Sequence, residues 1–183
     1  MKINTTHLSE LYIVDTIRQL DERGSFSRLF CHDELAVLMG ERKIAQINTS
    51  RTSQLGAIRG LHFQKPPAAE MKLIRCIRGE VFDIAIDLRK NSPTFLQWYG
   101  QVLSAENAKM MVIPEGFAHG FQTTQADTEM LYLHTEFYAK KHEAGLNFAD
   151  PLLNIEWPLP ISEISDKDRN YPHLSNDYKG IEI

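Results

Sequence analysis

Alternating apolar and polar residues recur in short stretches along this chain. In residues 81–88, for example, Phe82, Ile84, Ile86 and Leu88 occupy every second position. A period of two is typical of a β-strand that buries one face. Comparable stretches predict further strands at residues 11–17, 44–48, 57–63, 72–77, 98–103 and 110–113. Many short strands with little helix predict an all-β protein, either a sandwich or a jelly roll, and such folds can enclose a ligand.

A second alternating stretch, residues 129–138, has an unusual polar set. Leu131, Leu133, Thr135 and Phe137 alternate with Met130, Tyr132, His134, Glu136 and Tyr138. The second set is too polar for a face buried in a sandwich core, so it suits either the wall of a wet pocket or an exposed sheet face. If its leucine neighbours take the apolar face, Tyr132 points the other way, into a pocket.

Little helix is predicted. Residues 33–39 form the clearest helical stretch, with Asp33 as its N-cap, and residues 165–170 predict a short helical turn. The chain after Asp150 is expected to be irregular and to wrap over the sandwich. With 183 residues and no linker or repeat, the chain is expected to form one domain, residues 1–183.

Composition excludes several classes of protein. A net charge of −4 argues against general nucleic-acid binding, although a local cluster of arginines can still bind a phosphorylated small molecule. Cys31 and Cys76 have no metal-site spacing and are expected to be reduced thiols. Residues 1–7 are polar and no apolar run approaches the roughly 20 residues of a membrane helix, so we expect a cytoplasmic protein.

Basic residues and histidines concentrate in segments that otherwise resemble half-buried strands. They are Arg59 and His62, then Lys72, then His119. Histidine can take a proton at neutral pH, and lysine and arginine can stabilise the negative charge that results. These residues predict a pocket for an anionic substrate. Strict alternation places Arg59 and His62 on opposite faces, unless Gly60 marks a bulge or Arg59 reaches the pocket from its rim.

Several segments, in this order, resemble the dTDP-4-dehydrorhamnose 3,5-epimerase family. They are residues 21–26, 46–48, 59–64, 87–95, 114–121, 131–132, 155–158 and 164–168. The resemblance implies an all-β, cupin-like double-stranded jelly roll with short peripheral helices. It also implies an isomerase that uses no metal or other cofactor and inverts a nucleotide diphosphate 4-keto-6-deoxyhexose at C3 and C5. Such an enzyme would serve deoxysugar synthesis for a surface polysaccharide or a related glycoside.

The same resemblance assigns four catalytic roles. The protons on C3 and C5 lie next to the C4 ketone, so removal of either leaves an enolate, which needs a base, an acid on the opposite face and a positive group. His62 corresponds to the base and Asp168 to the aspartate that orients it. Tyr132 corresponds to the acid and Lys72 to the cation at the C4 oxygen. Asp166 or Asp168 could instead cap the turn that Ser165 opens.

Further positions match the family's contacts with substrate. They are Arg23, Phe26, Gln46, Asn48, Arg59, His119, Glu143 and Lys167, with Tyr138 as a second candidate for the acid. Arg59 would bind the diphosphate, and Phe26 would stack on the nucleotide base. The family forms homodimers with exchanged amino-terminal segments, so Arg23 and Phe26 would serve the neighbouring subunit.

Two departures from the family pattern fall on the nucleotide side. Arg28 stands where the family commonly has an acidic residue, and residues 49–55 form a segment one residue longer than usual. Arginine only donates hydrogen bonds, so the nucleotide contact at Arg28 would differ from the family's. One alternative is therefore a related epimerase that inverts only C3 or C5 of a different nucleotide sugar.

Two other classes of protein share parts of this pattern, namely metal-binding cupins and sugar-nucleotide-binding proteins without activity. Pro114, Gly116 and His119 resemble the second motif of metal-binding cupins, but the first motif has His62 without a second histidine two residues later. Nitrogen-rich metal sites need that ligand set. A sugar-nucleotide-binding protein without activity would have lost His62 or Tyr132, and both are present.

Overall fold

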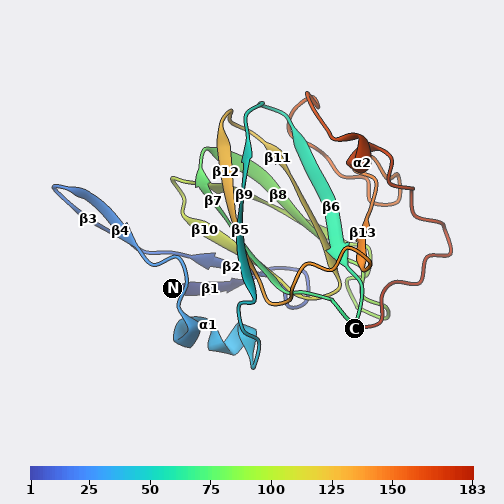
Figure 1. Cartoon of the computed structure of the whole chain (residues 1–183), viewed down its shortest axis with the longest axis horizontal. Helices are drawn as coiled ribbons and strands as arrows, with labels where there is room; N and C mark the ends of the chain where they lie inside the picture. Colours follow the sequence, from blue (N-terminus) through green and yellow to red (C-terminus); the bar gives the residue numbers. More distant parts are fainter.

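The computed structural model describes residues 1–183, and it confirms the all-β prediction. Two antiparallel sheets face each other, with strand orders β1-β2-β10-β7-β12-β5 and β13-β6-β11-β8-β9, while β3 and β4 form a separate hairpin (Figure 1). The strands are β1 (Lys2–Thr5), β2 (Tyr12–Asp15), β3 (Arg18–Asp21), β4 (Gly24–Ser27), β5 (Gln46–Thr52), β6 (Ile58–Gln64), β7 (Lys72–Arg78), β8 (Glu80–Asp87), β9 (Trp98–Ser104), β10 (Lys109–Ile113), β11 (Phe117–Thr123), β12 (Thr128–His134) and β13 (Glu143–Gly145).

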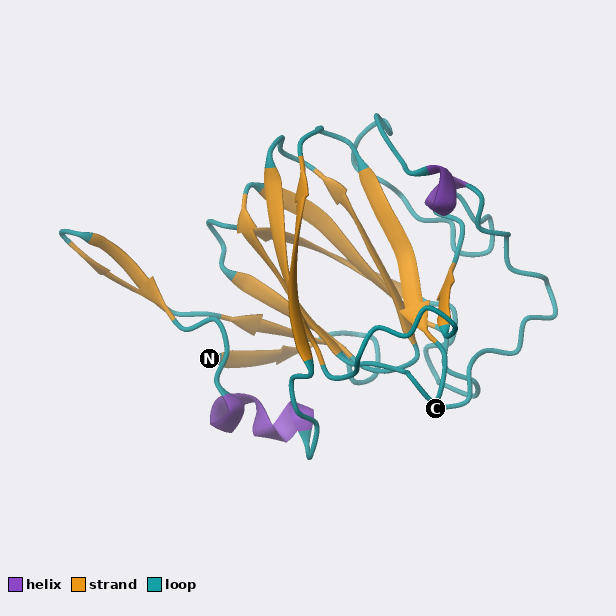
Figure 2. Ribbon diagram, in the orientation of Figure 1, coloured by secondary structure: helices purple, strands orange, loops and turns teal.

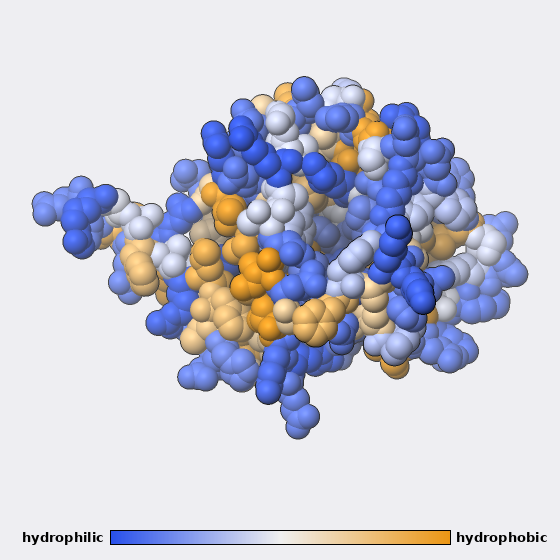
Figure 3. All heavy atoms as spheres, viewed as in Figure 1, coloured by the Kyte–Doolittle hydropathy of each residue, from blue (hydrophilic) through white to orange (hydrophobic).

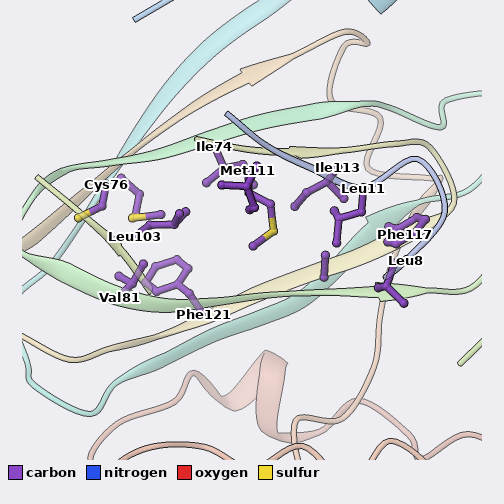
Figure 4. Close-up of a cluster of buried hydrophobic side chains, with 13 residues drawn as sticks. Leu8, Leu11, Ile74, Cys76, Val81, Leu103, Met111, Ile113, Phe117 and Phe121 are labelled. Carbon is purple, nitrogen blue, oxygen red and sulfur yellow. The ribbon is translucent and has the colours of Figure 1, made fainter. Parts of the chain in front are cut away.

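Hydrophobic residues pack in part of the space between the sheets and cover the outer face of each. The inner cluster contains Ile74 and Met111 from one sheet and Val81 and Phe121 from the other (Figure 4). A second cluster packs α1 on the outside of the first sheet, and a third packs the carboxyl-terminal chain on the outside of the second. The prediction that this terminal region wraps over the sandwich is confirmed (Figure 2).

The helices differ from the prediction in one detail. Helix α1 spans His32–Met39, and its N-cap is Cys31, not Asp33. Asp33 lies inside the first turn, where a carboxylate still interacts favourably with the helix dipole. Helix α2 (Asp166–Arg169) confirms the predicted turn, and the hydroxyl of its N-cap, Ser165, accepts a hydrogen bond from the Asp168 N–H. No helix is long and apolar enough to cross a membrane.

The alternating stretches located most strands but missed others. All the predicted strands are present with shifted ends, and β12 stops at His134 because residues 135–138 turn away from the sheet. The prediction missed β1, β3, β4, β11 and β13, which lack a clear alternation of apolar and polar residues. Strands as short as β1, β3, β4 and β13 are held by pairing with a neighbour rather than by their own pattern. β11 is longer, but it is buried on both faces, so its residues do not alternate.

Of the two alternatives for Arg59, the bulge at Gly60 is present, and it brings Arg59 to the same side as His62. His62 pairs with His119 and Arg59 pairs with Phe121, so β6 has one residue more than β11 between these pairs. Gly60 has φ of +117°, and a Cβ there would lie 2.6 Å from the Cα of Gly120. Only glycine fits both conditions. The bulge therefore allows Arg59 and His62 to face one cavity.

A hairpin arm, β3–β4, projects away from both sheets (Figure 3). Its two ends are held by Arg75, which is 2% exposed and donates to the Leu29 carbonyl at 3.1 Å and to the Thr16 hydroxyl at 2.5 Å. Burial lowers the pKa of Arg75 to about 10. Beyond this anchor the arm exposes Phe26, whose side chain contributes nothing to the core of its own chain.

Candidate active site

One cavity of about 770 Å³ lies between the two sheets. Its walls come from β5, β7 and β12 on one side and from β6 and β11 on the other, with the chain around α2 closing one edge. Only five of its 21 lining residues are hydrophobic. Eight of the predicted site residues line it: His62, Lys72, Tyr132, Asp168, Asn48, Arg59, His119 and Lys167. This polar hollow suits a charged ligand better than an apolar one.

His62 and Asp168 form a hydrogen-bonded pair at the cavity edge. The His62 Nε2 lies 2.7 Å from Asp168 Oδ1, and the N–H of Gly60 donates to Oδ2 at 3.1 Å. Burial alone would raise the pKa of Asp168, but the hydrogen bond and the charge of His62 hold it below its usual value. An ionised carboxylate only accepts, so Nε2 carries the proton and Nδ1 is left as a base. Asp166 is exposed and makes no such contact.

Tyr132 points into the cavity as predicted. Its neighbours Leu131 and Leu133 pack in the outer cluster with α1, on the opposite face of β12. The Tyr132 hydroxyl lies 2.8 Å from the hydroxyl of Ser50 on β5. Burial raises the pKa of Tyr132, even though Ser50 acts in the other direction. The phenol therefore keeps its proton until a strong base, such as an enolate carbon, is formed beside it.

Lys72 and Arg59 give the cavity positive charge at two depths. The Lys72 side chain is only 9% exposed, unlike most lysines, and its Nζ donates to the His62 carbonyl at 3.3 Å. Arg59 lies nearer the opening, where Nε donates to the Thr52 hydroxyl at 2.8 Å and a terminal nitrogen donates to the Arg51 carbonyl at 3.2 Å. A buried ammonium and an outer guanidinium suit an enolate oxygen and a phosphate, respectively.

His119 belongs to a second imidazole–carboxylate pair. Its Nε2 lies 2.7 Å from Oδ1 of Asp83, and its ring meets that of Tyr132 edge to face at 6.3 Å. Burial raises the pKa of Asp83, although the neighbouring imidazole opposes this. The other oxygen of Asp83 is the one buried side-chain polar atom without a hydrogen-bond partner. Such a costly arrangement indicates that His119 needs a fixed orientation.

Six predicted substrate contacts do not line the cavity in this chain. Arg23 and Phe26 lie on the projecting arm, and Arg28 follows it and pairs with Glu34 at 2.5 Å. Gln46, Tyr138 and Glu143 form a polar group linked by hydrogen bonds of 2.9 and 3.1 Å. Lys167, which does line the cavity, joins this group through Glu143 at 2.6 Å.

Sequence reasoning missed several polar residues that complete the site. Ser50, Asp83 and His134 are the main ones. Two of them could have been found from the sequence. His134 has the same parity as Tyr132 in the alternating stretch, and Asp83 is a carboxylate within an otherwise apolar strand. Ser50 had no such signal. The structure contains no group of three or more His, Cys, Asp or Glu side chains arranged to hold a metal ion.

Comparisons with known proteins agree on one family. The family model described as dTDP-4-dehydrorhamnose 3,5-epimerase matches residues 5–176. The dTDP-4-dehydrorhamnose 3,5-epimerase of Shigella flexneri is 42% identical over 171 residues, which cover 93% of this chain and 94% of that protein.

Two solved structures are similar over nearly the whole fold. The dTDP-4-dehydrorhamnose 3,5-epimerase of Bacillus anthracis, with TDP and PPi bound, has a TM-score of 0.91 and 39% identity, over 94% of this chain and 99% of that one. A dTDP-6-deoxy-D-glucose-3,5-epimerase of Legionella pneumophila, in complex with dTDP-4-keto-L-rhamnose, has a TM-score of 0.87 and 41% identity, over 91% and 89% of the two chains. These likenesses confirm the cupin-like jelly roll.

Proposed function

Because the chain belongs to the dTDP-4-dehydrorhamnose 3,5-epimerase family, we propose that its cavity inverts a dTDP-linked 4-keto-6-deoxyhexose at C3 and C5. The enzyme is an isomerase of the racemase and epimerase type. One observation supports this chemistry best: the same cavity is lined by His62, Asp168, Tyr132 and Lys72. A base, an acid and a cation are the groups that epimerisation next to a ketone requires.

The proposed reaction begins with proton removal by His62. Its Nδ1 takes the proton from C3 or C5, and the electrons of the broken C–H bond form the enolate, with negative charge on the C4 oxygen. Asp168 stabilises the resulting imidazolium. The ammonium of Lys72 stabilises the enolate oxygen in a site largely withdrawn from water.

Protonation from the opposite face then inverts the centre. Tyr132 donates its hydroxyl proton to the same carbon, and the enolate electrons return to form the new C–H bond. His62 has gained a proton and Tyr132 has lost one, so exchange with solvent restores both. No electron is gained or lost overall, and the step needs no second substrate.

The nucleotide is proposed to lie toward the opening of the cavity. Arg59 would bind the diphosphate there, and Asn48 and residues 49–54 line the same side. The arm carries Arg23 and an exposed Phe26 away from the cavity of its own chain. A homodimer in which each arm reaches the other copy would bring these two residues to the nucleotide.

The proposed function is tested by mixing the protein with a dTDP-4-keto-6-deoxyhexose and following the sugar by proton NMR. The coupling constants of the ring protons report the configuration at C3 and C5. We expect both centres to invert, at a rate that treatment with a chelator leaves unchanged. A sugar that stays unchanged, or activity that requires a stoichiometric metal, would contradict the proposal.

Arg28 is expected to alter nucleotide preference. Its guanidinium favours carbonyl or phosphate oxygens, whereas the family's acidic residue accepts from the base. We expect wild type to accept UDP-, CDP- or GDP-linked 4-keto-6-deoxy sugars alongside the dTDP sugar, or to invert one centre faster than the other. Arg28→Glu should narrow the preference to the dTDP sugar, and kcat/KM for each sugar measures this.

A matched control for charge is Arg28→Gln, which keeps a donor but loses the pairing with Glu34. It should lie between wild type and Arg28→Glu. Two results together would show that Arg28 does not set specificity. Wild type would strongly prefer the dTDP sugar and invert both centres, and Arg28→Glu would only weaken substrate binding.

A further inference from the structure

Three imidazole–carboxylate pairs surround the cavity, and the proposed reaction uses only one of them directly, the pair of His62 and Asp168. His62 pairs with Asp168 and His119 with Asp83. In the third pair, Nδ1 of His134 lies 2.8 Å from Oε2 of Glu70. His134 lines the cavity, and the side chains of Glu70 and His134 are 7% and 13% exposed. A buried charge of this kind is costly and points to a specific role.

The backbone brings this third pair to Lys72. His134 ends β12 and pairs directly with Lys72, the first residue of β7, in the antiparallel register. Directly opposite residues project their side chains from the same face, so two basic groups stand side by side. Glu70, two residues before Lys72, places its carboxylate between them: Oε1 lies 3.3 Å from the Lys72 Nζ.

Electrostatics favours an ionised Glu70 in this position. Burial by itself would raise the pKa of Glu70, but the hydrogen bond from His134 and the charge of Lys72 together hold it below its usual value. The carboxylate can therefore accept from both neighbours at once. Because Lys72 also donates to the His62 carbonyl at 3.3 Å, its ammonium is held from two directions.

His134 also contacts the proposed acid. Its ring stacks on that of Tyr132, with the ring centres 6.1 Å apart and 22° between the planes. The Nδ1 contact with Glu70 fixes the imidazole of His134, and the ring of Tyr132 also contacts that of His119, edge to face. The orientation of Tyr132 is thus supported by both histidines.

We propose that Glu70 and His134 are positioning residues of the epimerase. Glu70 holds the Lys72 ammonium where the enolate oxygen forms, and it holds the His134 ring against Tyr132. This inference rests on the proposed function, since it assigns to Lys72 and Tyr132 the roles given there. It extends that function by two residues that act through other side chains and do not touch the reacting carbon.

The test is a double-mutant cycle between Glu70 and Lys72. Glu70→Gln keeps the shape of the side chain and removes its charge. We expect it to lower kcat by about 10²-fold with little change in KM, because a misplaced catalytic group costs about that much. In a Lys72→Ala background, Glu70→Gln should lower kcat by a clearly smaller factor than in wild type, since one of the two groups through which Glu70 acts is gone and only the contact with His134 remains.

Two companion variants keep the test decisive. His134→Asn loses the stacked ring and should lower kcat when it is the only substitution. In a Tyr132→Phe background it should have little further effect. This pair of variants tests the inference even if Glu70→Gln does not fold. Glu136→Gln is the matched control, because Glu136 lies two residues after His134 and outside the cavity lining. It should retain the wild-type kcat.

The possible outcomes distinguish a failure of the positioning roles from a failure of the proposed epimerase function. If wild type epimerises the sugar but Glu70→Gln and His134→Asn retain the wild-type kcat, the positioning roles are wrong and the function stands. A second result would also contradict the inference: Glu70→Gln lowers kcat by the same factor in Lys72→Ala as in wild type, and His134→Asn does so in Tyr132→Phe. Such independent losses would indicate a general effect on the fold. An inactive wild type would instead contradict the proposed function itself.

Discussion

Replacing His62 with alanine is expected to lower the rate of epimerisation by about 10²–10⁴-fold, which is the usual contribution of a general base. The other two imidazoles that line the cavity, His119 and His134, project from β11 and β12, so neither occupies the place of His62 on β6. The variant should also fail to exchange the C3 and C5 protons with deuterated water, because exchange requires the same proton removal. NMR of the sugar measures both losses.

The aspartate behind His62 provides a matched pair of variants. Asp168→Asn should also be severely impaired, because an amide in place of the carboxylate cannot stabilise the imidazolium. Asp166→Asn should behave as wild type, since Asp166 is exposed and lies outside the cavity lining. Equal activity in Asp168→Asn and wild type would remove Asp168 from the mechanism.

Replacing Tyr132 with phenylalanine is expected to separate exchange from inversion. The variant keeps His62, so an α-proton should still exchange with solvent, but the acid on the opposite face is lost. Inversion should fall by about 10²–10⁴-fold while exchange falls much less. The hydrogen bond to Ser50 is also lost, yet the ring still packs beside His134 and His119, so the fold should be retained.

Tyr138→Phe tests the second candidate for the acid. Tyr138 is 57% exposed and its hydroxyl donates to Glu143, outside the cavity lining. If Tyr138→Phe loses inversion and Tyr132→Phe does not, the acid has been misassigned. Wild-type inversion in both variants would transfer the role to a water molecule.

The sequence predicted those parts of the fold and site that depend on local pattern. Alternation located the strands of the two main sheets except β1, β11 and β13, and it showed which way Tyr132 points, because parity alone decides the face of a residue in a strand. Strict alternation placed Arg59 and His62 on opposite faces, which left either a bulge at Gly60 or an Arg59 at the rim of the pocket, and the register shift in β6 shows the bulge.

Other features depend on contacts between distant segments, which no local pattern encodes. Glu70 precedes β7 and becomes part of the site only because β12 places His134 beside Lys72. Asp83 and Ser50 likewise acquire partners from other strands. The predicted helix cap was also wrong: the N-cap of α1 is Cys31, two residues before Asp33.

The central claim is that one cavity inverts the sugar by removing and replacing protons. The most direct test is to run the wild-type reaction in deuterated water and to locate deuterium in the product by NMR. We predict one deuterium at C3 and one at C5 in the inverted sugar, and none at C2. Inverted product that contains no solvent deuterium would contradict the claim, because it would show that the centres invert without an exchangeable proton on His62 or Tyr132.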